Sequence, residues 1–239
     1  MSSGAGFNLP QWSLLSSEQE QIVNFPVNKN YLVQGSPGTG KTVMALYRAA
    51  RISLRDNIPV TILVINRPLM LYMQSAIRGN RDFRNINIMT YQSWVSDFYR
   101  KYLGTSAPKA DDNTYEFLWD EVLEDFSRVP NKISHIIIDE AQDLPIELIK
   151  GLNIVAKNIT CFIDPNQAIE ANKTDVIDEL MELCIECPVT LTKNYRNTKD
   201  IVALSKLYWN GEGYFAESNK LGPGSRKPRI IKCRTMDFN

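Results

Sequence analysis

The residues with the clearest chemical potential form a glycine-rich segment near the N-terminus. Its members are Gly35, Ser36, Pro37, Gly38, Thr39, Gly40, Lys41 and Thr42. They match the pattern GxxxxGK[ST], in which backbone N–H groups curl around phosphates and the following helix adds the positive end of its dipole. We expect Lys41 to reach the β- and γ-phosphates and the Thr42 hydroxyl to be a hard oxygen ligand for Mg²⁺. A strand-like run before the segment and a helical pattern after it favour this site over a glycine-rich turn that matches by chance.

A second candidate group follows the apolar run HIIIDEAQD, which begins at His135. The run is typical of a buried strand, and its carboxyl end would deliver Asp139 and Glu140 to the edge where α/β sheets bind ligands. We expect Asp139 to hold Mg²⁺ and Glu140 to orient and deprotonate an attacking water, because the chain has only one histidine to offer instead. Acids at a helix N-terminus are the alternative, and the phosphate loop in the same chain favours the metal and base roles. His135 is interpreted as structural.

A third candidate is Arg196, in the segment TKNYR that follows another strand-like run. An arginine here could act as a finger on the γ-phosphate while charge develops in the transition state. A surface arginine at the beginning of a helix fits the local sequence equally well. The local sequence therefore leaves both interpretations open.

Short apolar runs separated by helical patterns are expected to position these groups. The predicted strands are Tyr31–Gln34, Val60–Ile65, Asn85–Thr90, His135–Ile138, Thr160–Asp164 and Val189–Thr192, and the clearest helices are Thr42–Leu54 and Pro145–Ala156. Continuous apolar runs are typical of parallel strands that are covered on both faces, and their alternation with helices predicts a doubly wound α/β layer. The aromatic, amphipathic stretch 94–131 is expected to form a small helical insertion.

Composition narrows the class of protein. The 239 residues carry 27 basic and 27 acidic side chains, which excludes a uniformly basic surface but not a local basic groove. No apolar run approaches the roughly 20 residues that span a bilayer, and the N-terminus has no secretory pattern. Four cysteines are too few for a disulfide framework, and the CxxC of Cys184 and Cys187 is interpreted as reduced thiols rather than zinc ligands. These features predict a cytoplasmic protein without a membrane segment.

In order and spacing, these segments resemble the first RecA-like domain of superfamily 1 helicases, in the UvrD/Rep-like branch. LSSEQ (15–19) resembles the Q motif, the phosphate loop motif I, and VINRPLMLYM (64–73) motif Ia. TYQSW (90–94) is similar to a motif of that branch, DEAQD to motif II, FIDPNQAI (162–169) to motif III and NYRNT (194–198) to motif IV. The resemblance covers about residues 12–210. It implies a RecA-like P-loop NTPase fold, ATP and Mg²⁺ as cofactors, and an ATP-dependent DNA helicase or translocase.

The resemblance also implies roles for single residues. Gln19 would contact adenine, Gln142 and Gln167 would sense the γ-phosphate and couple it to DNA, and Arg196 would touch the γ-phosphate. For Gln19 a second interpretation stays open, because Ser16-x-x-Gln19 also fits a capping box at a helix start. We expect one side chain to do both jobs poorly.

Single-stranded DNA is the partner that the resemblance implies, with RNA not excluded. The positions that would track the strand are Asn66, Arg67, Thr90 and Tyr91. Backbone contacts together with aromatic stacking would bind a strand without reading its sequence. Trp94 could stack on a base, but its place at the foot of a helix favours a core position. Relatives carry aromatic residues after motif III, whereas this chain has Glu170–Lys173 there, which puts that stacking contact in doubt.

The resemblance ends before a second RecA-like domain and its motifs V and VI. We therefore divide the chain into an ATP-binding helicase domain at residues 1–210, with its insertion at about 94–131, and a linker with the start of an absent second domain at 211–239. Translocation needs two domains that close and open around the nucleotide. The alternative is a nucleotide-binding switch or interaction module without helicase activity. A small-molecule kinase would leave DEAQD and NYRNT unexplained.

Overall fold

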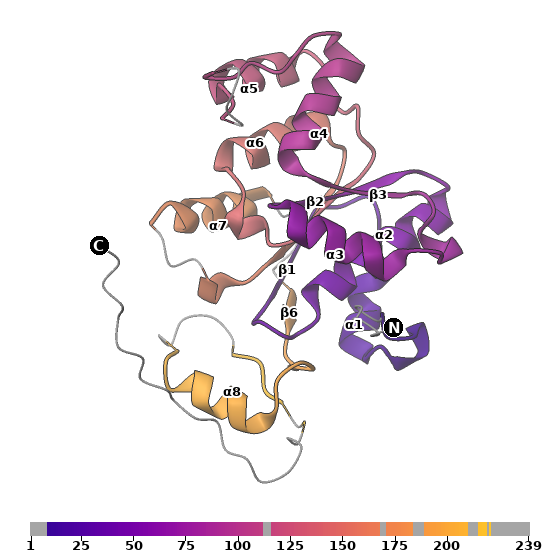
Figure 1. Ribbon diagram of the computed structural model, residues 1–239, viewed down its shortest axis with the longest axis vertical. Helices are drawn as coiled ribbons and strands as arrows, with labels where there is room; N and C mark the ends of the chain where they lie inside the picture. The colour runs from indigo at the N-terminus through magenta and orange to yellow at the C-terminus, as the bar shows by residue number, and fades with distance from the viewer. Residues whose placement is uncertain are drawn as a thin grey trace, which may run out of the picture.

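A six-stranded, all-parallel sheet forms the centre of the protein in the computed structural model (Figure 1), which describes residues 9–111, 116–167, 171–183 (171–176 as backbone only), 189–209, 215–218 and 220. The strands are β1 (Tyr31–Gly35), β2 (Val60–Val64), β3 (Ile86–Thr90), β4 (Ile136–Ile138), β5 (Ile159–Ile163) and β6 (Val189–Leu191). Their order is β3-β2-β4-β5-β1-β6, and every pairing is parallel. The predicted α/β fold and its six strands are confirmed, each strand to within one residue at either end.

Helices cover both faces of the sheet (Figure 1). They are α1 (Ser17–Val23), α2 (Lys41–Asp56), α3 (Arg67–Ile77), α4 (Tyr91–Phe98), α5 (Trp119–Ser127), α6 (Ile146–Val155), α7 (Ala171–Leu183) and α8 (Lys199–Lys206). Successive strand residues point to opposite faces, so Ile137 packs with α1, α2 and α3 while Ile136 and Ile138 pack with α4, α5 and α6. Two apolar layers therefore hold the sheet, which explains why its strands are continuous apolar runs.

The predicted helical insertion is present and begins earlier than expected. Thr90 caps α4 directly at the end of β3, so the helix starts at Tyr91 and continues as a π-helical turn at 99–103 before α5. The Trp94 ring lies 5.3 Å from that of Phe98 and 6.0 Å from that of Phe126, centroid to centroid. The core interpretation of Trp94 is confirmed. The division at residue 210 stays a prediction, since most of 211–239 lies outside the described residues.

His135 lies just before β4, at the opposite end of that strand from Asp139. It is buried, and its Nε2 atom is 3.0 Å from the Thr160 hydroxyl. Burial, aided by the nearby charge of Arg48, lowers the pKa of His135 to about 3. The neutral imidazole is therefore part of the core, as the structural interpretation predicted.

None of the helices in the described parts of the chain has the length and apolar character that a membrane span requires.

Acidification is expected to remove stability through His135. Its folded-state pKa lies below its ordinary value of 6.5, so the unfolded chain binds more protons between about pH 6.5 and 3 and stability falls across that window. We compare the unfolding free energy of wild type with that of His135→Gln at each pH. The wild-type value minus the variant value should be about 2 kcal/mol smaller at pH 5 than at pH 7. Urea unfolding of both proteins at each pH measures it. The variant is needed as reference, because Asp139, with its raised pKa, shifts stability in the opposite direction. An equal advantage at both pH values would contradict a buried neutral imidazole.

Candidate nucleotide-binding site

The glycine-rich segment connects β1 to α2 and has the backbone of a phosphate-binding loop. Gly38 and Gly40 have φ angles of 90° and 94°, in the left-handed region that glycine adopts without strain. Gly40 is the N-cap of α2, and the Thr39 hydroxyl donates to the Ser36 carbonyl at 2.9 Å. The loop therefore leads directly into the N-terminus of α2, whose positive dipole end suits an anion.

Lys41 is the buried cation of this loop. Its Nζ donates to the Gly35 carbonyl at 3.0 Å and lies 3.7 Å from Glu140 Oε1 and 3.8 Å from Asp164 Oδ2. The side chain is only 5% exposed. An ammonium held in this way, at the mouth of a loop of N–H donors, is well placed for the terminal phosphates of a nucleotide.

Asp139 follows β4 and is fully buried. Neither of its carboxylate oxygens makes a hydrogen bond of normal geometry within the described parts of the chain, although the Thr42 hydroxyl is close enough to lower its pKa. Burial and the neighbouring Glu140 charge outweigh that effect and raise the pKa of Asp139. A buried carboxylate without a partner beside a hydroxyl fits a hard cation such as Mg²⁺. No cluster of three or more possible metal ligands occurs among the described residues, and Mg²⁺ needs only one or two protein ligands beside phosphate and water.

Glu140 has a strained backbone and a fixed carboxylate. Its φ of 53° is in the left-handed region, which costs a non-glycine residue on the order of 1–3 kcal/mol and occurs preferentially at functional sites. Gln142 Nε2 donates to Glu140 Oε2 at 2.9 Å, and Gln142 Oε1 accepts from the Asp164 N–H at 3.1 Å. Gln142 thus joins the ends of β4 and β5 and holds the Glu140 carboxylate, whose side chain remains 24% exposed and can reach water.

Asp164 belongs to the site but was not singled out from the sequence. It follows β5, is fully buried, and forms the second ion pair of Lys41. Burial raises its pKa against the opposing effect of Lys41. The strand order places β5 between β1 and β4, so Asp164 lies between the phosphate loop and Asp139. The signal in the sequence was the same as for Asp139, an acid directly after a buried apolar run.

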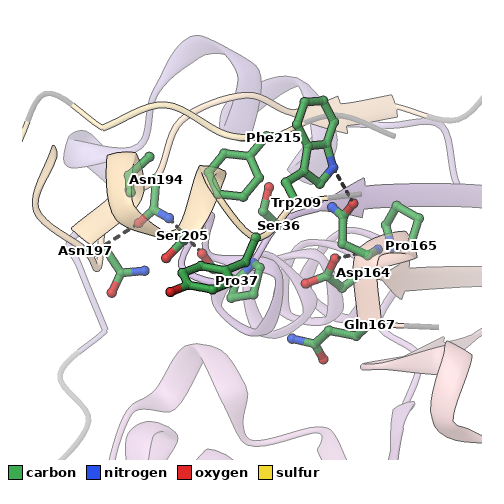
Figure 2. A pocket seen from close by; sticks show the side chains of 13 residues that line it. Ser36, Pro37, Asp164, Pro165, Gln167, Asn194, Asn197, Ser205, Trp209 and Phe215 are labelled. Carbon is green, nitrogen blue, oxygen red and sulfur yellow. Dashed lines mark hydrogen bonds between the residues drawn. The ribbon is translucent and has the colours of Figure 1, made fainter. Parts of the chain in front are cut away.

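Gln167 lies at the end of a 3₁₀ turn, Pro165–Gln167, on the rim of a cavity of about 560 Å³. Figure 2 shows it with Asp164 on one side of this cavity and Asn194 on the other. Ser36 and Pro37 of the phosphate loop also line it. Contact of Gln167 with a γ-phosphate stays a prediction. Ala168, Ile169 and Glu170 lie outside the described residues, as do the side chains of 171–173. The doubt about a base-stacking contact after motif III is therefore not tested.

A second cavity, of about 330 Å³, brings together Gln19 and Arg196 on the other side of the loop. Its lining residues are Pro10, Leu14, Gln19, Gly38, Gly40, Val43, Tyr72, Tyr195 and Arg196. Because α8 begins only at Lys199, Arg196 does not start a helix. Tyr195, which the sequence analysis did not assign, presents a 44% exposed ring here.

Gln19 was considered for two roles, helix capping and adenine contact. The capping box is present: Gln19 Oε1 accepts from the Ser16 N–H at 3.1 Å, and the Gln19 N–H donates to Ser16 Oγ at 3.3 Å. The other amide atom, Nε2, lies near Gly40, where an added Cβ would be 3.2 Å away. The cap uses Oε1 and the backbone N–H of Gln19. The expectation that one side chain would do both jobs poorly stays a prediction. Adenine contact stays a prediction.

The predicted nucleic-acid residues lie at the ends of β2 and β3, whose register pairs Val64 with Thr90. The Asn66 side chain accepts from the Leu69 N–H and caps α3, and Thr90 accepts from the Ser93 N–H and caps α4. Arg67 is exposed, and Tyr91 packs partly against the core. Asn66 and Thr90 thus have local structural roles, and their contact with a DNA strand stays a prediction.

Cys184 and Cys187, interpreted above as reduced thiols, lie outside the described residues.

Several known proteins are similar to this chain. The ATP-dependent DNA helicase SRS2 of Saccharomyces cerevisiae is 28% identical over 92 residues, which cover 34% of this chain and 8% of that protein. Bacteroides Pif1 bound to ssDNA matches with a TM-score of 0.44 and 15% identity, over 81% of this chain and 45% of that one. The Arterivirus nonstructural protein 10 helicase matches with a TM-score of 0.42 and 14% identity, over 85% and 43%. The chain thus spans less than half the length of each.

The family assignment rests on a stronger match. The model of the family described as Schlafen group 3, DNA/RNA helicase domain, matches residues 28–208, which include the phosphate loop, both acids after β4 and Arg196. This match confirms the helicase resemblance read from the motifs. The chain belongs to the Schlafen group 3 DNA/RNA helicase domain family.

Proposed function

We propose that this chain is the ATP-binding part of an ATP-dependent DNA helicase or translocase, in which ATP hydrolysis drives movement on single-stranded DNA. The observation that carries the proposal is the convergence of Lys41, Asp139 and Glu140 on one phosphate loop, with Asp139 buried and without a hydrogen-bond partner among the described residues. These groups are the cation, metal ligand and base that phosphoryl transfer to water requires.

Each of these residues has a distinct task in hydrolysis. Lys41 would exchange its carboxylate neighbours for the β- and γ-phosphates. Thr42 and Asp139 would hold Mg²⁺, which supplies positive charge to the phosphate oxygens and also favours the charged form of Asp139. Glu140 would accept a proton from the attacking water, and Gln142 keeps its carboxylate in place.

The rest of the nucleotide would occupy the two cavities beside the loop. In the smaller one, Gln19 Nε2 would donate to the adenine and the Tyr195 ring would offer it a face. Arg196 and Gln167 would approach the γ-phosphate from opposite sides of the loop. This arrangement explains how residues distant in the chain could sense whether a triphosphate is bound.

DNA would lie at the same edge of the sheet, over β2 and β3. The N-termini of α3 and α4 offer their positive dipole ends there, and Arg67 and Tyr91 could contact phosphate and base. A second RecA-like domain outside this chain would supply the moving partner. A cytoplasmic location is part of the same proposal.

Lys41→Ala tests the nucleotide site. Calorimetric titration with ATP and ADP in the presence of Mg²⁺ should show binding to wild type that weakens about tenfold or more in the variant, because a charge-assisted contact to phosphate is lost. Lys157→Ala, at the amino end of β5 and exposed, is the matched control and should bind like wild type. Equal affinity of Lys41→Ala and wild type would rule out the loop as the phosphate site.

The same proteins are then assayed for ATP turnover with and without single-stranded DNA. Stimulation by DNA is expected when a second RecA-like domain is present, because strand contacts and the nucleotide site share one edge of the sheet. A turnover rate there that ignores DNA would count against a translocase.

A further inference from the structure

Asn194 lies in the segment after β6 and lines the larger cavity together with Pro37 of the phosphate loop (Figure 2). Its Nδ2 donates to the Pro37 carbonyl at 2.8 Å, and the next residue, Tyr195, donates its N–H to the Gly38 carbonyl at 2.8 Å. Asn194 as a whole residue is only 7% exposed. Two carbonyls of the loop are therefore held by consecutive residues from the other end of the chain.

The carboxamide oxygen of Asn194 shapes the turn that leads to Arg196. It accepts from the Arg196 N–H at 3.1 Å and from the Asn197 N–H at 2.9 Å. An asparagine oxygen that accepts from N–H groups two and three residues on sets the direction of the backbone between them. One side chain thus uses its donor on the phosphate loop and its acceptor on the backbone of Arg196.

The contact between turn and loop leaves no free space. A Cβ at Gly38 would lie 2.6 Å from Asn194 Oδ1 and 2.9 Å from the Arg196 Cβ. Atoms packed this closely move together or not at all. A change in the shape of the loop around phosphate would therefore also displace the turn.

The chain before the turn is anchored independently of Asn194's side chain. The Thr192 N–H and hydroxyl both donate to the Glu18 carboxylate, at 3.1 and 2.9 Å, and the Asn194 N–H donates to the Glu217 carbonyl at 2.8 Å. The Asn194 carboxamide thus joins the phosphate loop to the turn at Arg196, with a hydrogen bond on each side.

We propose that Asn194 is a positioning residue that holds Arg196 in register with the phosphate loop, and through it favours nucleoside triphosphate over diphosphate. The inference rests on the proposed ATP site. Arg196 lines the cavity beside Gly38 and Gly40, so its guanidinium reaches the terminal phosphate only if its backbone keeps its place above the loop. ADP has no γ-phosphate for that guanidinium to contact, so ADP binding does not depend on the hydrogen bonds of the Asn194 side chain.

Asn194→Asp removes the hydrogen bond to the Pro37 carbonyl and keeps the hydrogen bonds to the turn at Arg196. The aspartate retains acceptors for the Arg196 and Asn197 N–H groups, but it has no donor for the Pro37 carbonyl and repels it. Fluorescence titration with Mg²⁺ and either ADP or a non-hydrolysable ATP analogue should show that the wild-type preference for the analogue falls about tenfold, while the ADP affinity changes less than about twofold. Arg196→Ala should show the same loss, and the double variant no further loss. Lys199→Ala, exposed at the start of α8, is the control and should bind both nucleotides like wild type.

Three results would overturn the inference: an unchanged preference for the triphosphate, an equal weakening of both nucleotides, or additive losses in the double variant. Wild-type protein that binds neither nucleotide would instead overturn the proposed function, and the inference with it. If Asn194→Asp unfolds in a thermal melt, Asn194→Ser replaces it. Its hydroxyl can still accept from the turn but is too short to reach the Pro37 carbonyl.

Discussion

Replacing Glu140 by glutamine is expected to reduce ATP turnover by about a hundredfold or more, while nucleotide affinity stays within a few-fold of wild type. Glutamine cannot accept a proton from water, but its oxygen can still accept the hydrogen bond from Gln142 Nε2 that now ends on Glu140 Oε2. Lys41, Thr42 and Asp139 keep their own side chains, and Lys41 loses its ion pair with Glu140 but keeps the one with Asp164. The variant therefore separates chemistry from binding.

Phosphate release in a single turnover with single-stranded DNA measures the rate, and calorimetry measures the affinity. The rate is measured in this chain and in any longer protein to which it belongs. Glu147→Gln, in the first turn of α6, is the matched control and should leave both quantities unchanged. Normal turnover in Glu140→Gln would assign the base to another group. Loss of nucleotide binding would show that the carboxylate is needed to hold Lys41 rather than to activate water.

Replacing Arg48 by methionine is expected to lower the free energy of unfolding by about 3 to 5 kcal/mol. Arg48 is fully buried on α2 and donates to the carbonyls of Val23, at the end of α1, and of Phe25 and Pro26, in the segment before β1. Burial lowers its pKa to about 10, so it remains charged at neutral pH. Methionine fills most of the volume but leaves three carbonyls without that donor, each at a cost of about 1 to 3 kcal/mol when buried.

Urea unfolding at pH 7 measures the effect. Arg51→Met is the control, because Arg51 is exposed on the same helix, and its replacement should change stability by less than about 0.5 kcal/mol. Equal stability of Arg48→Met and wild type would show that the carbonyls are satisfied by other means. The loss should be independent of nucleotide, since Arg48 contacts the segment before β1 and not the phosphate loop.

Local features of the sequence were sufficient for much of this protein. The phosphate loop is a run of neighbours whose geometry depends on their own glycines and on the helix that follows, and GxxxxGK[ST] encodes both. The strands were predicted to within one residue because a parallel strand buried on both faces must be apolar throughout. The capping box at Ser16 and Gln19 is equally local. These elements are specified by residues a few positions apart.

Contacts between distant segments were decided only by the tertiary structure. The strand order places β5 beside both β1 and β4, which brings Asp164 to Lys41, and no local pattern states that order. The same holds for the hydrogen bond from Asn194 to the Pro37 carbonyl and for those from Arg48 to the carbonyls after α1. A polar residue in a helical pattern, such as Arg48, looks exposed until its neighbours are known. The physical reason is that a side chain's partners depend on how the helices and strands pack. Sequence patterns specify those elements, whereas burial and hydrogen bonding between them arise only when the chain is folded.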